Sequence, residues 1–271
     1  MTIKRSTYIF FPALLTAGVY LAGCSKQLSE RVYPVASLNV VNALPNSAPL
    51  MLVQGSIASA IGDFSNISGL SYGNSFVLTP ASGSEVFYAV QGNADTTSAG
   101  SKGPDFMFNG TLNFKAGGLY SLFITGQDTT NPDFLFVQDV LPGITDSSVG
   151  IRFVNLSTGS NPLSINLEGS SNGSEVGNLP YKGITGFKQY VNNSTTIDYL
   201  FVVRDATTGD SLTQFDFLAS GSGNDGNGLT DPSNSQNNGT LLTFKHVTIA
   251  VYGSGSTISS NPLSTMLIDN Y

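Results

Sequence analysis

The sequence predicts an all-β protein that contains two tandem Ig-like β-sandwich domains after a lipoprotein signal peptide. First, 30 glycines and 12 prolines accompany many Ser, Thr and Asn residues, whereas long runs of helix-favouring residues are absent. Second, apolar and polar residues alternate with the period of a strand over residues 163–168 and 247–252. Third, six sequence blocks recur in the same order in both halves, which indicates duplication of a domain.

The first element is an export signal that ends at the only cysteine. Lys4 and Arg5 precede an apolar run over residues 8–22. As a helix this run would reach about 22 Å, short of the roughly 30 Å hydrocarbon layer of a membrane. Leu21-Ala22-Gly23 stands directly before Cys24, and this ending resembles the signal of a bacterial lipoprotein.

The lipoprotein resemblance implies where the chain is held. Residues 1–23 would be the signal peptide, Cys24 the site of lipid attachment, and residues 24–35 a lipidated tether. Two or three acyl chains would anchor the protein permanently, because each buried methylene contributes about 0.8 kcal/mol. Lipoproteins retained in the inner membrane often have Asp after the cysteine, whereas this chain has Ser25. The resemblance therefore implies the outer membrane, with the periplasmic and cell-surface faces both open.

The internal repeat divides the remaining chain into two domains, predicted over residues 36–146 and 147–271. A period above 100 residues gives each copy its own core and argues against a solenoid of short repeats. With one cysteine no disulfide is possible, so stability must come from these cores. The matched blocks are 37–42 with 150–155, 49–50 with 162–163, Gly55 with Gly169, 70–73 with 179–182, 110–115 with 239–245, and the closing strands 134–139 with 265–269.

Alternation within the strands identifies the candidate core. Short, regularly spaced strands with Gly and Pro turns favour an Ig-like sandwich, in which one face of each strand is buried. The positions predicted to face the two cores are Tyr120, Leu122, Ile124, Leu163, Ile165, Leu167, Val247, Ile249 and Val251, with Ser164, Asn166 and Glu168 facing outward.

The order of the repeated motifs resembles one known family. Val-Asn, Pro-Leu, Gly-Leu-x-Tyr, Leu-x-Phe-Lys-Ala-Gly-Gly-x-Tyr and a Gly two residues after Ile124 are similar to the domain-of-unknown-function family 4397 (DUF4397), in two copies. The resemblance implies an Ig-like sandwich found in exported, often lipid-anchored envelope proteins, without an established activity. Family members more often carry His and acidic residues where this chain has residues 42–48, so no ligand site is transferred to that loop.

Residues that could carry catalysis or bind a metal are sparse. The only histidine, His246, is out of phase with Val247, so we expect a solvated histidine that points outward from an edge strand. No nucleophile elbow or phosphate loop appears, and one His with no available Cys excludes the usual zinc sets. Residues 224–231 resemble a calcium loop but lack its twelfth-position Glu. We therefore predict no catalytic residue, no cofactor and no metal.

Several polar residues are predicted to have structural roles. Asn42 and Asn155 should close turns, and Tyr72 and Tyr181 should pack their rings inward while their hydroxyls fix turns. Short Asp-Thr-Thr and Asp-Ser-Leu sequences at 95–97, 128–130 and 210–212 resemble a bacterial O-glycosylation pattern, but we interpret them as turns. Binding, if present, is expected at the long loops 93–110 and 219–239.

These features predict a non-catalytic outer-membrane lipoprotein that acts as a binding or scaffolding module of the cell envelope. Its partners would be the membrane, through the anchor, and an envelope protein or glycan. Nucleic acid is excluded because the chain has a net charge of −7 and no basic block. Two alternatives stay open. One is a lipidated, pilus-like subunit that exchanges the strand 265–269, and the other is a carbohydrate-capturing accessory protein of a nutrient-uptake system.

Overall fold

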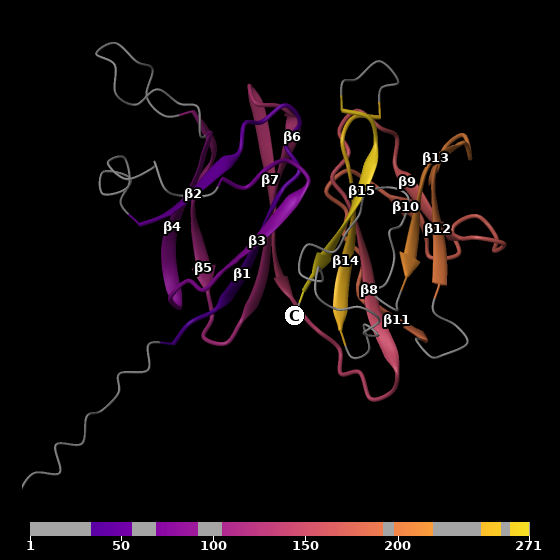
Figure 1. Cartoon of the computed structure of the whole chain (residues 1–271), viewed down its shortest axis with the longest axis horizontal. Helices are drawn as coiled ribbons and strands as arrows, with labels where there is room; N and C mark the ends of the chain where they lie inside the picture. The colour runs from indigo at the N-terminus through magenta and orange to yellow at the C-terminus, as the bar shows by residue number, and fades with distance from the viewer. Residues whose placement is uncertain are drawn as a thin grey trace, which may run out of the picture. The chain divides into compact units, whose positions relative to one another are not determined.

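The computed structural model describes residues 34–55, 69–91, 105–191, 198–218, 245–255 and 261–270. These residues belong to one compact unit, Pro34–Tyr271. As predicted, the fold is all-β (Figure 1). In the described ranges no helix is long and apolar enough to cross a membrane.

Two sheets build the first half of the chain. The larger has the order β3-β1-β6-β7, and the smaller has the order β2-β4-β5. Strand β1 is antiparallel to β3 and parallel to β6, whereas β4 is antiparallel to both of its neighbours. The strands are β1 (Ser37–Asn42), β2 (Leu50–Gln54), β3 (Asn74–Leu78), β4 (Gly83–Gln91), β5 (Phe106–Phe114), β6 (Leu119–Asp128) and β7 (Asn131–Asp139).

The second half repeats this topology, and its described residues include one further strand, β10. Its sheets have the orders β11-β8-β14-β15 and β10-β9-β12-β13, and β8 is again antiparallel to one neighbour and parallel to the other. Strand β10 extends the sheet beyond β9, the counterpart of β2, and at the matching place in the first half Leu70 forms a bridge with Leu50 of β2. The strands are β8 (Ser148–Asn155), β9 (Leu163–Leu167), β10 (Val176–Leu179), β11 (Lys188–Val191), β12 (Asp198–Asp205), β13 (Ser211–Leu218), β14 (His246–Tyr252) and β15 (Ser264–Asp269).

Each half has its own core between its two sheets. The predicted inward positions of β6 lie in the first core, and those of β9 and β14 lie in or against the second. Aromatic rings add edge-to-face contacts within each core, such as Phe87 with Phe114 and Phe153 with Phe201. Because burial of one large apolar side chain contributes about 1.5–3 kcal/mol, each core is a substantial source of stability.

The outer face of β9 differs from the prediction. Ser164 and Asn166, expected to be solvated, are only 6% and 3% exposed. Oδ1 of Asn166 accepts hydrogen bonds from the backbone N–H of Gly173, in the connection from β9 to β10, and from the hydroxyl of Ser164. The period-two pattern correctly separates the two faces of β9, but both faces are covered.

The two predicted asparagines close equivalent turns. The side-chain Oδ1 of Asn42 and of Asn155 accepts a hydrogen bond from the backbone N–H two residues later. Each Nδ2 donates to a backbone carbonyl in the matching Leu-x-Tyr block, that of Leu70 at 3.0 Å and that of Leu179 at 2.9 Å. The sequence repeat therefore extends to individual hydrogen bonds.

One backbone position of the repeat is conformationally costly. Gly73 has a φ of 78°, and its counterpart Lys182 has a φ of 59°. This left-handed region suits glycine but strains a residue that carries a Cβ. The side chain of Lys182 makes an ion pair with Asp133 of the first half, with Nζ 2.8 Å from Oδ2.

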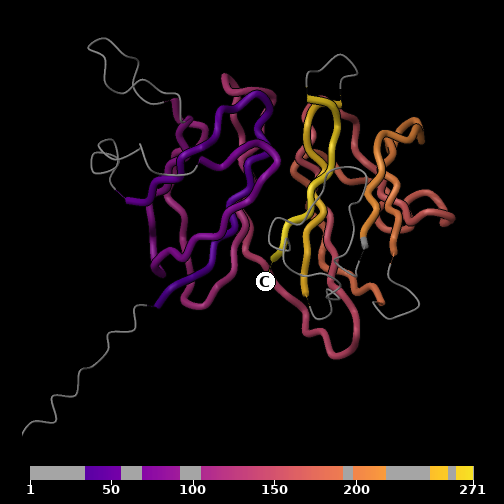
Figure 2. The backbone as a smooth tube through the Cα atoms, viewed as in Figure 1, coloured from indigo at the N-terminus to yellow at the C-terminus, as the bar shows by residue number. Residues whose placement is uncertain are grey.

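The two halves meet through the sheets β3-β1-β6-β7 and β11-β8-β14-β15. In each sheet the contact uses the face that points away from the core of its own half. Figure 2 shows the yellow C-terminal strand β15 on the side of the second half that faces the first. A third apolar cluster fills this contact, which we call the inter-half cluster. Its buried members are Val41, Ala43, Phe123, Val154, Leu156, Ala250, Met266 and Ile268.

Candidate functional site

Several residues named from the sequence lie outside the described part of the chain. These are Cys24, the signal peptide 1–23 and the loop 219–239, together with the Asp-Thr-Thr sequence at 95–97 and the loop at 224–231. Of the loop predicted over 93–110, residues 106–110 belong to strand β5. Of the two other Asp-containing sequences, 128–130 is a turn as predicted, because Asp128 accepts from the backbone N–H of Thr130. The prediction of a turn at 210–212 is wrong, because Ser211 and Leu212 begin strand β13 and the turn lies just before Asp210.

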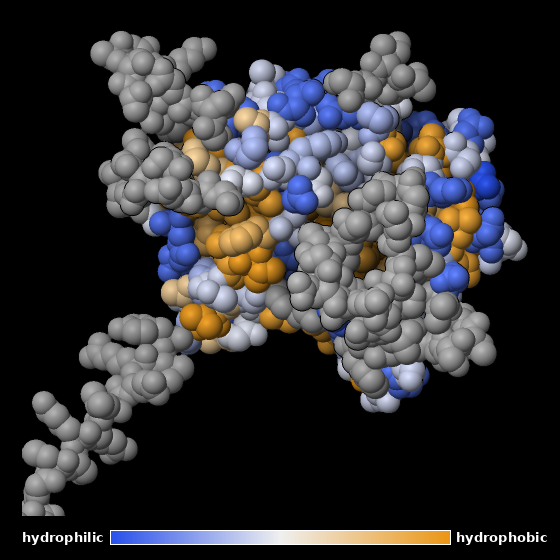
Figure 3. Space-filling view, in the orientation of Figure 1, coloured by the Kyte–Doolittle hydropathy of each residue, from blue (hydrophilic) through white to orange (hydrophobic). Residues whose placement is uncertain are grey.

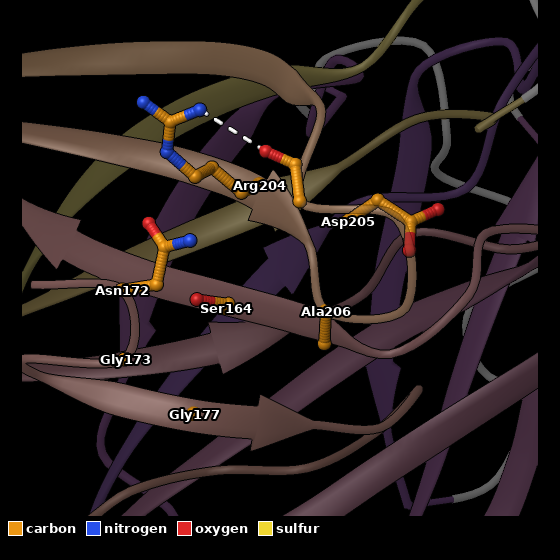
Figure 4. Close-up of a pocket in the computed structure, with 8 residues that line it drawn as sticks. Ser164, Asn172, Gly173, Gly177, Arg204, Asp205 and Ala206 are labelled. Atoms are coloured by element: carbon orange, nitrogen blue, oxygen red, sulfur yellow. Dashed lines mark hydrogen bonds between the residues drawn. The ribbon is translucent and has the colours of Figure 1, made fainter.

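A polar recess lies in the second half, where β9, β10 and β12 meet (Figure 4). Its volume is about 100 Å³. Glycines form part of its wall, so the backbone is accessible there. The lining residues are Ser164, Asn172, Gly173, Gly177, Arg204, Asp205, Ala206 and Gly209.

The charged side chains of the recess make hydrogen bonds with neighbouring backbone and side-chain groups. The guanidinium of Arg204 donates to the backbone carbonyl of Gly209 at 3.1 Å. The carboxylate of Asp205 points away from Ser164 and Asn172 in Figure 4. It accepts from backbone N–H groups of its own turn and from Asn161, and these bonds hold its pKa below the ordinary value. The recess thus presents a cation, a hydroxyl and an amide, and its lining contains no aromatic ring on which a sugar could stack.

His246 is the main correction to the sequence-based prediction. It is buried, with 6% exposure, and β14 lies between β8 and β15, so it is not on an edge strand. As the alternation predicted, His246 and the core-facing Val247 point to opposite faces of the sheet. The face that carries His246 is nevertheless covered by other parts of the chain. The Nε2 atom lies 2.9 Å from the carbonyl oxygen of Pro142, and the ring of Phe187 packs edge-on at 5.1 Å. Burial lowers its pKa, which favours the neutral ring.

A buried polar network joins the two halves. Nη2 of Arg152 lies 2.7 Å from Oδ1 of Asp139, and both side chains are almost fully buried. Ser121 donates to the other carboxylate oxygen of Asp139 at 2.7 Å, and Nε of Arg152 donates to Thr248 Oγ1 at 2.7 Å. The guanidinium also lies over the Phe187 ring, 4.7 Å from its centroid. Such extensive pairing is what allows two charges to be buried.

Strand register shows that the residues of this network come from positions that correspond to one another in the two halves. Asn39 and Arg152 are counterparts on β1 and β8, because each stands three residues before its turn-closing asparagine. Asp139 pairs opposite Leu119, and Asn270 donates its backbone N–H to the carbonyl of His246, the counterpart of Leu119. The sequence match of Asp139 with Asp269 is therefore displaced by one residue, and Asn270 is the structural counterpart.

Tyr72 and Tyr181 occupy the contact between the halves, which corrects their predicted role. The ring of Tyr72 packs edge-on against Tyr252 of the other half, with ring centroids 5.1 Å apart, and burial raises its pKa. The hydroxyl of Tyr181 donates to Asp133 of the first half at 3.4 Å. The ring of Tyr72 therefore packs on the other half instead of the core of its own, the hydroxyl of Tyr181 bonds across the contact, and neither hydroxyl fixes its own turn.

Comparisons with known proteins add little. No protein-family model matches the chain, and no curated protein matches it. One solved structure with some likeness is described as a "putative adhesin" from Bacteroides ovatus. It is 13% identical, the match covers 85% of this chain and 94% of that chain, and the TM-score is 0.18. A score this low does not establish a shared fold or function.

Proposed function

We propose that this chain is a lipid-anchored protein of the bacterial outer membrane whose two joined halves act as a non-catalytic binding or scaffolding body. The observation that carries the proposal is the sequence Leu21-Ala22-Gly23-Cys24, which stands a short distance before Pro34, where the compact unit begins. An acylated Cys24 would tie the folded body to a membrane through residues 25–33.

The inter-half contacts support a scaffolding role over an enzymatic one. Arg152 and Asp139 form a buried ion pair across the contact, and the inter-half cluster removes apolar surface of both sheets from water. A body held together in this way presents surfaces on both halves in a fixed relation. The side chains of His246 and Asp205, which could take part in acid–base chemistry, are engaged in structural hydrogen bonds.

The geometry gives less support to the two alternative functions. A pilus-like subunit would exchange β15, but Met266 and Ile268 of this strand lie in the inter-half cluster, and their release would open a contact that both halves share. A carbohydrate-capturing protein would use aromatic platforms, whereas the polar recess is lined by small and polar residues. Binding of the chain from Ser25 onward to a glycan array, lost on Arg204→Ala, would transfer the proposal to carbohydrate capture.

Lipid attachment is tested by metabolic labelling with palmitate in a Gram-negative host. We expect label on the wild-type chain and on Ser25→Ala, the matched control, and membrane association of both. Cys24→Ala should lose the label and leave the membrane fraction. Equal labelling of Cys24→Ala, or a wild-type chain without label, would overturn the proposal.

A further inference from the structure

Three large apolar side chains on one margin of the first half are about half exposed. They are Val35 (47%), Phe76 (55%) and Val77 (50%), and we call them the apolar edge. Figure 3 shows hydrophobic surface over the region of β3 and near the start of β1. Strand β3 ends its sheet, contains no charged residue and pairs with β1 in an unbroken register. Edge strands are ordinarily protected by charges, prolines or bulges, and β3 has none of these protections.

The apolar edge presents side chains on both faces of its sheet. Phe76 pairs opposite Val40, which faces the core, and Val77 pairs opposite Asn39, which faces the second half. A ligand that covers one face of the sheet would contact only one of the two. A surface that meets the sheet edge-on contacts both, and adjacent Val35 extends the contact along the strand direction.

The apolar edge lies where the chain enters the compact unit. Val35 forms a bridge with Ala81, just after β3, and the carbonyl of Pro34 accepts from the backbone N–H of Ser82 at 2.9 Å. Cys24 precedes Pro34 by ten residues, which span at most roughly 33–36 Å when fully extended. A lipid on Cys24 would therefore hold the apolar edge within that distance of the leaflet that carries the anchor.

We infer that the apolar edge rests on the phospholipid leaflet and orients the protein on it. The inference relies on the proposed lipid anchor. A short tether gives the apolar edge an effective concentration at the leaflet of about millimolar order. A weak apolar contact is therefore sufficient to keep the edge on the leaflet. Insertion of Phe76 and Val77 at the boundary between headgroups and acyl chains removes their exposed area from water. Lys115 is exposed in the turn whose Gly117 N–H donates to the Val35 carbonyl, and its ammonium can approach lipid phosphates.

The test replaces the natural anchor, so that its result does not depend on acylation of Cys24. The chain from residue 25 retains the whole compact unit and has no cysteine. With an N-terminal histidine tag it is attached to phosphatidylcholine vesicles that contain a nickel-chelating lipid. Val77→Cys carries an environment-sensitive NBD dye, and Leu212→Cys on β13, where the native residue is 39% exposed, serves as the matched control.

We expect attachment to vesicles to raise the NBD emission at position 77 severalfold and shift it to the blue, and brominated acyl chains to quench it. The dye at position 212 should not change. Phe76→Asp, at an exposed position, should abolish the change at 77 while attachment and the circular dichroism spectrum stay as in the parent. Equal behaviour of positions 77 and 212 on vesicles would overturn the inference. A concentration-dependent change at 77 without vesicles would also overturn it, because the edge would then bind a second copy.

Discussion

Removal of one partner of the buried Arg152–Asp139 pair should be among the most destabilising single changes available in this chain. Asp139→Ala leaves the guanidinium of Arg152 without its carboxylate partner in a site where the Arg152 side chain is only 5% exposed. The hydroxyl of Ser121 loses its hydrogen-bond acceptor as well. A broken buried pair typically costs about 3–5 kcal/mol, and we expect a loss of stability in that range.

A double variant compares the loss of one charge of the pair with the loss of both. Asp139→Leu and Arg152→Met are made singly and together, and the double variant replaces both charges with apolar side chains. Because the desolvation cost of two ions disappears together with their attraction, the double variant should lie within about 1–2 kcal/mol of the parent. The coupling between the two sites should therefore be about 2 kcal/mol or more.

Urea unfolding of the chain from residue 25 provides the assay. Tyrosine fluorescence and far-ultraviolet circular dichroism report on both halves, and the parent chain should show coincident transitions because the halves share a buried contact. The Asp139→Ala variant should unfold at lower urea, with separated transitions for the two halves. If the single changes each cost less than about 1 kcal/mol, or if the double variant loses their sum, the buried pair does not join the halves as described.

Three further changes test local features. Lys182 has a φ of 59°, so Lys182→Gly should be more stable than Lys182→Ala by about 1 kcal/mol. Both variants lose the ion pair with Asp133, and only glycine avoids the backbone strain. Equal urea midpoints of the two variants would contradict this prediction. Gly150→Ala should lower the free energy of unfolding by about 1–3 kcal/mol, because the new Cβ would lie 2.5 Å from the His246 ring. Gly143→Ala is the control, since a Cβ there meets no atom within 4 Å, and it should be as stable as the parent. Burial holds the pKa of His246 below 6.5, so the unfolded chain binds its proton more readily. Stability should then decline as the pH falls from 7 to 5, and His246→Gln should make that decline smaller. A decline of the same size in the parent and in His246→Gln would contradict the lowered pKa.

The sequence predicted those parts of the fold that depend on local pattern. The alternation in β9 and β14 identified core residues such as Ile165 and Ile249, and the repeated Asn and Leu-x-Tyr blocks identified equivalent turns. These signals suffice because a two-residue period and a turn-closing side chain act over a few neighbouring residues.

The sequence could not predict which outer faces are covered. Alternation places His246 opposite Val247, but only the path of the segment before β8 shows that Pro142 covers it. Likewise Asn39 and Ser121 alternate with core-facing neighbours in their strands, and their burial follows from the packing of one half on the other. The polar recess arises from three strands whose contributing residues are far apart in sequence, so no local motif marks it.

The covalent state of Cys24 tests the central claim most directly. Mass spectrometry of the protein extracted from membranes of its native host should give an N-terminal peptide that begins at Cys24 and carries the mass of its acyl chains. A peptide that continues through Gly23 into Cys24, or an unmodified thiol on protein recovered from the cytosol, would contradict the account.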